Sequence, residues 1–178
     1  MTLKALGAFL FETFKLVLVS FLIIAPIRYF VVQPFFVLGA SMEPTFQNGD
    51  YLIIDEISYS VGNPDRGDVI VFHYPYNTKQ FYIKRIVGLP GEILVLDDKG
   101  VTVKNKDNPE GFGLSEEYLP VKEEYGNITM TLGNDEYFVM GDNRDASSDS
   151  RRWGALKREF IVGKVLVRAF PFQKMEAF

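Results

Sequence analysis

The alternation of apolar and polar positions changes at about residue 41. Before that point, residues 5 to 27 read ALGAFLFETFKLVLVSFLIIAPI and are apolar apart from Glu12 and Lys15. A run of roughly 20 apolar residues is long enough to cross a bilayer as a helix. Glu12 and Lys15 are three positions apart, so they share a helical face and can pair there. The pattern predicts a transmembrane helix over about residues 5 to 27, in an N-terminal segment of residues 1 to 28.

A cleavable signal peptide is the alternative interpretation of this segment. Its apolar core would span about 7 to 15 residues. Here the apolar run continues past Arg28 into YFVVQPFFVLGA, although the final LGA could imitate a cleavage site. The length of the run favours an uncleaved anchor. Lys4 and Arg28 flank the helix on opposite sides, so charge does not orient it.

Beyond residue 41 the pattern changes to short runs rich in Val, Ile, Tyr and Phe, separated by Gly, Pro, Asn and Asp. Such runs are typical of β-strands joined by turns. Eight strands are predicted: YLIID, GDVIVFHY, FYIKRIVG, EILVLDD, GVTVKN, NITMTL, EYFVMGD and FIVGKVLVRAF. Residues 105 to 126 are polar, contain Gly and Pro and have no period, which predicts an exposed excursion from the sheet. We therefore expect an all-β domain of antiparallel sheets over residues 29 to 178, with about one helical turn near GALKREF.

Composition narrows the possible functions. The net charge is −4 and the Lys and Arg residues are scattered, so the basic patch of a nucleic-acid-binding protein is missing. The chain has no cysteine, which excludes disulfides, a thiolate nucleophile and cysteine-based metal sites. No metal or organic cofactor is indicated.

Ser41 is a candidate nucleophile, because it lies between small residues and a Met-Glu-Pro turn. A serine hydroxyl needs an adjacent base, and a lysine can serve only when it is neutral, which requires burial. Lys84 lies in the apolar strand QFYIKRIVG, where alternation turns it and Arg85 to opposite faces. Taken alone, Ser41 is more typical of a turn and Lys84 of an exposed edge strand. The chain has one histidine, His73, which is the other candidate base.

A polar loop follows the apolar strand EYFVM. Residues 141 to 154 read GDNRDASSDSRRWG and combine three Asp, three Arg, three Ser and one Asn. A solvated loop is the simplest interpretation, but so many matching donors and acceptors also suit a fixed hydrogen-bond network.

In this order, SMEPT, KRIVGLPGE and GDNRDASSDSRRWG resemble the three signature motifs of bacterial type I signal peptidases. These are membrane-anchored serine proteases with an all-β catalytic domain. The resemblance implies that Ser41 is the nucleophile and Lys84 the general base. It also implies that Ser147 orients the lysine amine and that Asp149 and Arg151 form a supporting ion pair. The motif is completed by Asp142, Asn143 and Arg144.

The same resemblance implies the partners and the location. The substrates would be secretory preproteins with small residues at the first and third positions before the cut. The protein would sit in the cell membrane, with its catalytic domain on the extracytoplasmic side. Residues 30 to 40 are apolar and are expected to rest on membrane lipid next to the nucleophile.

Two positions depart from the pattern of this family. Position 39 is Gly where some members carry a serine that helps bind the oxyanion, so the oxyanion hole must rest on the backbone N–H of Ser41 and on whatever other donor approaches it. Glu92 ends the middle motif where Asp is common.

Two other functions stay open at this stage. One is a Ser-His-Asp hydrolase that uses His73 with Asp68 or Asp55. The other is a non-catalytic, membrane-tethered β domain that binds protein partners.

Overall fold

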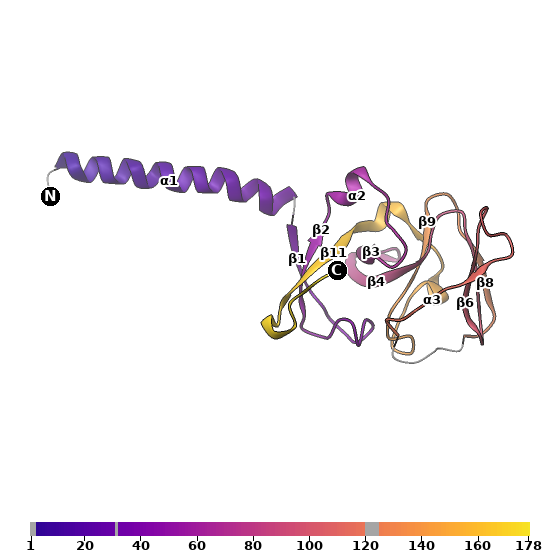
Figure 1. The fold of residues 1–178 in the computed structure, drawn as a ribbon. Helices are drawn as coiled ribbons and strands as arrows, with labels where there is room; N and C mark the ends of the chain where they lie inside the picture. Colours follow the sequence, from indigo (N-terminus) through magenta and orange to yellow (C-terminus); the bar gives the residue numbers. More distant parts are fainter. Residues whose placement is uncertain (1–2, 31, 120–124) are drawn as a thin grey trace.

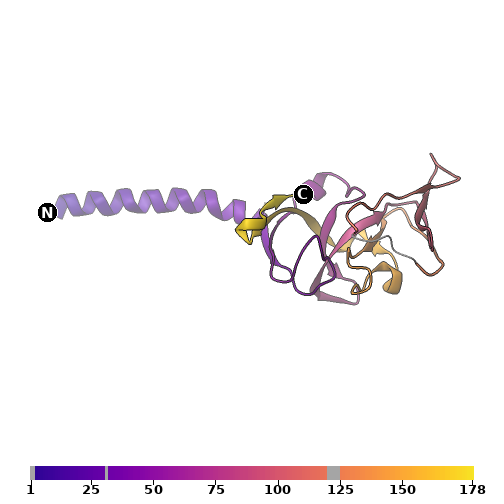
Figure 2. The same cartoon turned by 60° about the horizontal axis from the view of Figure 1, so that its bottom comes forward.

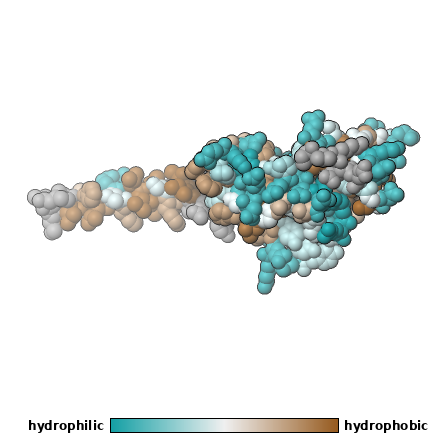
Figure 3. All heavy atoms as spheres, turned by 90° about the horizontal axis from the view of Figure 1, so that it is seen from below, coloured by the Kyte–Doolittle hydropathy of each residue, from teal (hydrophilic) through white to brown (hydrophobic). Residues whose placement is uncertain are grey.

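Helix α1, Leu3–Phe30, extends away from the rest of the chain (Figures 1 and 2). The structure is a computed structural model that describes every residue except 1–2, 31 and 120–124. Within the described part of the chain, Leu6–Ile24 is the one helical stretch long and apolar enough to cross a membrane, and none of it is buried. Its apolar side chains are brown in Figure 3, beside a largely hydrophilic face of the β domain. A signal sequence has the same properties, so the helix alone does not identify an anchor.

The rest of the described chain is dominated by antiparallel strands, which confirms the predicted fold class. The strands are β1 (Val32–Phe36), β2 (Tyr51–Asp55), β3 (Val69–Tyr74), β4 (Asn77–Gly88), β5 (Ile93–Asp97), β6 (Gly100–Lys104), β7 (Phe112–Gly113), β8 (Ile128–Thr131), β9 (Glu136–Met140), β10 (Leu156–Lys157), β11 (Ile161–Phe170) and β12 (Glu176–Ala177). Short helical turns connect them: α2 (Ser58–Val61), α3 (Ser150–Trp153), η1 (Arg158–Phe160) and η2 (Phe172–Lys174).

Among the described residues the strands form two sheets. The larger has the order β1-β2-β11-β3-β4-β9-β10, with β12 also paired to β11, and the smaller has the order β7-β6-β5-β8. An apolar cluster joins the two sheets, because it combines residues of β4 and β9 with residues of β5 and β6. Its fully buried members are Val87, Leu94, Leu96, Val103, Phe138 and Met140. Burial of these side chains fixes the smaller sheet against the end of β4.

All eight predicted strands are present, and the described residues form four more. Strand β1 is missed by the sequence pattern because its apolar residues continue the apolar run of α1. Pro34 lies within β1, and it is tolerated because β1 is at the edge of the larger sheet. Strands β7, β10 and β12 have only two residues each, which is too short to produce a pattern. Helix α1 is longer than the predicted range of 5 to 27 at both ends.

Residues 105 to 126 differ in part from the exposed excursion that we predicted. Strand β7 pairs with β6 in the smaller sheet. Tyr125 is buried against the cluster between the sheets, and Leu114 packs against the same cluster. Residues 120 to 124 of this segment lie outside the described residues. The segment therefore contributes apolar anchors to the domain as well as polar surface.

Candidate active site

Ser41 lies in a loop of residues 37 to 50, which connects β1 to β2 and is called the Ser41 loop below. The loop closes on itself, because Val37 N donates to Asp50 O at 2.9 Å and Gly49 N donates to Val37 O at 2.9 Å. The side chains of Met42 and Phe46 are fully buried in the apolar cluster beneath it. The loop is therefore a packed structure, and it holds Ser41 at a defined position.

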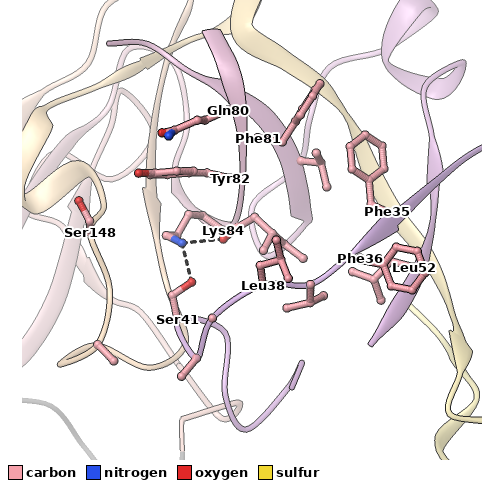
Figure 4. Close-up of a pocket in the computed structure, with 16 residues that line it drawn as sticks. Phe35, Phe36, Leu38, Ser41, Leu52, Gln80, Phe81, Tyr82, Lys84 and Ser148 are labelled. Carbon is pink, nitrogen blue, oxygen red and sulfur yellow. Dashed lines mark hydrogen bonds between the residues drawn. The ribbon is translucent and has the colours of Figure 1, made fainter. Parts of the chain in front are cut away.

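Lys84 contacts Ser41 directly. Its strand β4 runs between β3 and β9, so the lysine lies in the interior of the sheet and is 3% exposed. Lys84 Nζ donates to Ser41 Oγ at 2.7 Å and to the carbonyl oxygen of Ile83 at 2.8 Å (Figure 4). The edge-strand interpretation of Lys84 is thus wrong. An amine that is hydrogen-bonded to a serine hydroxyl is placed to take the proton of that hydroxyl.

The surroundings of Lys84 favour the neutral amine. Burial lowers the pKa of Lys84 to about 8, and the negative charges of Asp149 and Asp142 oppose that shift without reversing it. A low dielectric disfavours an ammonium ion, so burial is the dominant cause. A usable fraction of neutral amine is therefore present near neutral pH.

Arg85, the next residue along β4, turns to the opposite side and binds Asp142. The guanidinium donates to both carboxylate oxygens, with Nε–Oδ1 at 2.9 Å and Nη2–Oδ2 at 2.7 Å. Thr45 Oγ1 donates to the same carboxylate at 2.6 Å, and the Asp142 side chain is fully buried. Asp142 thus ties the polar loop to β4 and to the Ser41 loop.

Asp149 and Arg151 form a two-point ion pair within the polar loop. Arg151 Nε donates to Asp149 Oδ1 at 2.8 Å and Arg151 Nη2 donates to Oδ2 at 2.9 Å. Gly141 N also donates to Asp149 Oδ2 at 3.1 Å. Burial raises the pKa of the Asp149 carboxyl, but the hydrogen bonds of Arg151, the nearby Ser147 hydroxyl and the charge of Arg151 outweigh it and leave the pKa below its usual value. Asp149 therefore stays ionised and keeps the loop closed.

The other polar residues of the motif support the same loop. Asn143 N donates to the carbonyl oxygen of Ser41 at 3.1 Å, which links the polar loop to the Ser41 loop. Arg144 forms an ion pair with Glu116, a residue of the 105 to 126 segment. Ser147 is 2% exposed, and its hydroxyl makes no hydrogen bond of normal geometry among the described residues, although it lies close enough to Asp149 to lower the pKa of that carboxyl. Lys84 and Ser147 are thus not hydrogen-bonded to each other in this structure.

Gly141 explains how closely these loops approach. A Cβ atom at this position would lie 2.3 Å from Ser41 O and 2.4 Å from Ser147 Oγ. Only glycine leaves room for the two loops to touch at this point.

The backbone N–H of Ser41 makes no hydrogen bond within the described part of the chain. Gly39 has φ +95°, a conformation that favours glycine, and its N–H donates to Asn48 Oδ1 at 2.9 Å. The N–H of Gly39 is therefore occupied, whereas that of Ser41 is available to a further acceptor.

A cleft of about 630 Å³ runs past Ser41 and Lys84. Figure 4 shows Phe35, Phe36, Leu38 and Phe81 to one side of this pair and Ser148 to the other. The apolar side chains come from β1, β2, β3, β4 and the Ser41 loop, and Ala146 and Ser148 come from the polar loop. The cleft can thus accept an extended peptide with mainly apolar side chains. The described residues include no group of three His, Asp or Glu side chains that could hold a metal ion.

Comparison with known proteins identifies the family. The family profile described as "Signal peptidase, peptidase S26" matches residues 10–170. The chain belongs to this family. A probable signal peptidase I-1 of Synechocystis is 35% identical over 170 residues, which cover 92% of this chain and 84% of that protein. A signal peptidase I of Bacillus caldolyticus is 36% identical over 170 residues, which cover 88% and 89% of the two chains.

A solved structure agrees with this membership in the peptidase S26 family. The crystal structure of a signal peptidase I from Enterococcus faecalis is 34% identical, with a TM-score of 0.50. The match covers 58% of this chain and 97% of that one. The predicted family, fold class and enzyme class, a signal peptidase, are thereby confirmed.

His73, the alternative base, has a different environment from the one a catalytic triad needs. Its Nδ1 is 2.7 Å from the carbonyl oxygen of Thr78, and its ring packs against Phe81. Asp68 accepts a hydrogen bond from Tyr59 at 2.6 Å, and Asp55 accepts from Ser58. In the described part of the chain, no hydrogen bond joins His73 to Ser41 or to either Asp.

Sequence reasoning missed several residues that hold the site together. Thr45 lies inside the SMEPT motif, which is the one signal that could have found it. Glu116 lies in a segment with no pattern, and nothing in the sequence pairs it with Arg144. Glu92, which departs from the family pattern, is 5% exposed and accepts from Arg66 at 2.6 and 2.8 Å. A carboxylate at position 92 thus keeps a structural partner despite the longer side chain.

Proposed function

We propose that this chain is a membrane-anchored serine endopeptidase that removes signal peptides from secretory preproteins with a Ser41–Lys84 dyad. The observation that carries the proposal is the 2.7 Å hydrogen bond between Lys84 Nζ and Ser41 Oγ at a buried lysine. The names of the relatives support the reaction, since they are signal peptidases.

In the first step the neutral amine of Lys84 takes the proton of Ser41 as Oγ attacks the scissile carbonyl carbon. The carbonyl oxygen becomes an oxyanion, and the free N–H of Ser41 is the donor within reach of it. Collapse of this intermediate breaks the peptide bond, and the Lys84 ammonium protonates the leaving amine. The products are an ester at Ser41 and a free mature N-terminus.

In the second step Lys84, neutral again, takes a proton from a water molecule that attacks the ester. The ester bond breaks, Lys84 returns the proton to Ser41 Oγ, and the signal peptide leaves as a carboxylic acid that gives its remaining proton to solvent. In both steps Lys84 accepts and returns the proton of the attacking hydroxyl or water.

The cleft and α1 support a proposal for the substrate and the location. The apolar cleft suits the end of a signal peptide, with small side chains at the first and third positions before the cut. Helix α1 would anchor the enzyme in the cell membrane, with the β domain on the extracytoplasmic side, where exported preproteins emerge. Phe36 and Leu38 are exposed beside the cleft and would contact membrane lipid.

The test is cleavage of a preprotein in detergent by the full chain, compared with Ser41→Ala and His73→Ala. We expect cleavage by the wild type and by His73→Ala, and none by Ser41→Ala. Loss of cleavage in a folded His73→Ala protein would favour the Ser-His-Asp alternative. Absence of cleavage by the wild type would favour a non-catalytic domain.

The pH profile provides an independent prediction. Because the neutral form of Lys84 is the base and its pKa is lowered to about 8, kcat/KM should rise with pH up to about 8 and then level off. Below that value each pH unit should reduce kcat/KM about tenfold. The measurement is kcat/KM between about pH 6 and pH 10, with His73→Ala as the control that keeps the same acidic limb. If kcat/KM of the wild type instead falls with an apparent pKa near that of an ordinary histidine, and this fall is absent in His73→Ala, the base is not Lys84.

Ser147 provides a second prediction within the site. We infer that its buried hydroxyl accepts a hydrogen bond from the Lys84 ammonium during turnover and so orients it. Ser147→Ala should reduce kcat about tenfold and change Tm little, since the Ser147 hydroxyl makes no hydrogen bond of normal geometry in the resting structure and has only a weak contact with Asp149.

Ser150→Ala is the matched control for Ser147→Ala. Ser150 is equally buried in the same loop, but its Oγ accepts a hydrogen bond from Val139 N at 3.0 Å. Ser150→Ala removes that hydrogen bond, so it should lower Tm and leave kcat nearly unchanged. Equal kcat for wild type and Ser147→Ala would remove Ser147 from the mechanism.

A further inference from the structure

Arg168 is a buried arginine on β11 that lies outside the three sequence motifs. It is 7% exposed, and its guanidinium group is surrounded by acceptors. Nη1 donates to the carbonyl oxygen of Thr45 at 2.6 Å, Nε donates to that of Lys174 at 2.7 Å, and Nη2 donates to Glu176 Oε2 at 2.6 Å. One of these partners, Thr45, belongs to the Ser41 loop.

Thr45 is held from two directions. Its carbonyl oxygen accepts from Arg168, and its hydroxyl donates to Asp142 at 2.6 Å. Asp142 is in turn fixed by the two hydrogen bonds from Arg85. Thr45 therefore links two arginine–carboxylate systems, one in the polar loop and one at β11, and it is only four residues from Ser41.

The C-terminal end of the Ser41 loop, at Asp50, is also in contact with Arg168. Asp50 Oδ2 lies 3.5 Å from Arg168 Nη1 and accepts a hydrogen bond from Gln47 N at 2.9 Å. The guanidinium carbon lies 5.6 Å from the centre of the Phe46 ring, which is fully buried. Arg168 thus contacts three residues of the Ser41 loop: Thr45, the buried Phe46, and Asp50 at the end of the loop.

We propose that Arg168 is a positioning residue for Ser41: it fixes the Ser41 loop through Thr45 and Asp50 so that Ser41 Oγ stays within reach of Lys84 and the substrate. The proposal rests on the proposed function of Ser41 as the nucleophile. Arginine suits this role because its planar fork binds several acceptors at once.

A positioning role has a specific kinetic consequence. Without Arg168 we expect Met42 and Phe46 to stay in the core, but the Thr45 carbonyl loses its donor and the Asp50 carboxylate loses its ion-pair partner. A displacement of the nucleophile by about 1 Å is sufficient to reduce turnover about a hundredfold. Arg168 does not line the cleft, so substrate binding should change little.

The test compares Arg168→Gln with Arg158→Gln in preprotein cleavage by the full chain in detergent. Arg158 is the matched control, because it also donates to a backbone carbonyl, that of Tyr59, and it makes no contact with the Ser41 loop among the described residues. We expect Arg168→Gln to lower kcat about tenfold to a hundredfold with KM within about twofold. Arg158→Gln should lower Tm and leave kcat unchanged.

Arg168→Lys completes the experiment and covers the case in which Arg168→Gln fails to fold. A lysine keeps the charge opposite Asp50 but cannot bind all the acceptors at once, so kcat should recover only in part. If the wild type cleaves and the folded Arg168 variants keep wild-type kcat, or change only Tm as Arg158→Gln does, the positioning role is overturned and the proposed function stands. If the wild type does not cleave at all, both proposals fail.

Discussion

Replacing Lys84 by methionine should abolish preprotein cleavage and at the same time make the folded chain more stable. Methionine cannot accept the proton of Ser41, so kcat should fall at least about a thousandfold. At pH 7 the native lysine is mostly charged in a buried site, and the lowered pKa of about 8 corresponds to a destabilisation of about 3 kcal/mol. Methionine fits the same apolar surroundings without that charge.

The sign of the stability effect depends on pH. The pKa of Lys84 is lower in the folded state than in the unfolded state, so unfolding takes up protons between about pH 8 and the usual lysine pKa. The destabilisation by the native lysine is therefore complete below pH 8 and decreases as the pH rises above it. The difference in Tm between Lys84→Met and the wild type should shrink over the same range.

Lys84→Arg keeps a positive charge at this position but removes the group that can act as a base. Guanidinium stays protonated in proteins, so this variant should be inactive at every pH, and its buried charge should lower Tm below that of Lys84→Met. The measurements are kcat and thermal unfolding of the three proteins. Cleavage by Lys84→Arg, or a Lys84→Met protein that is both active and less stable, would contradict the role of Lys84.

The second large effect is expected at Asp149. Asp149→Ala leaves Arg151 without its partner carboxylate and Gly141 N without its acceptor in a buried loop. Loss of one member of a buried pair typically costs about 3 to 5 kcal/mol of unfolding free energy. Because the loop also holds the carbonyl of Ser41, activity should fall together with stability.

Urea unfolding of the full chain in detergent measures this effect. Lys164→Ala is the control, because Lys164 pairs with Asp68 at 3.8 Å in a more exposed position and should contribute less than about 1 kcal/mol. The pKa of Asp149 is lowered, so its contribution is present at neutral pH and is lost only as the pH falls through that lowered value. Equal unfolding free energies for Asp149→Ala and Lys164→Ala would exclude a supporting role for this ion pair.

The sequence predicted the strands well because their apolar residues alternate and their ends carry turn residues. It could not predict that Lys84 is buried. The pattern of β4 alone does not say whether the strand is at an edge or in the interior, and only the pairing with both β3 and β9 decides it. The opposite orientations of Lys84 and Arg85, by contrast, follow from strand alternation alone.

Long-range polar contacts were the least predictable part of the site. Arg168 and Thr45 are 123 residues apart, and Arg168 occupies an ordinary position in an apolar strand. Similarly, Glu116 lies in a segment that we predicted to be exposed, yet it pairs with Arg144. Such pairs depend on how sheets and loops fold back on each other, which local patterns do not record.

Sequencing the N-terminus of the cleaved product tests the central claim most directly. The purified full chain in detergent should cut a secretory preprotein once, after a small residue that has another small residue two positions before it, and Ser41→Ala prepared in parallel should yield no product. A cut elsewhere in the preprotein, or the same product from Ser41→Ala, would contradict the account.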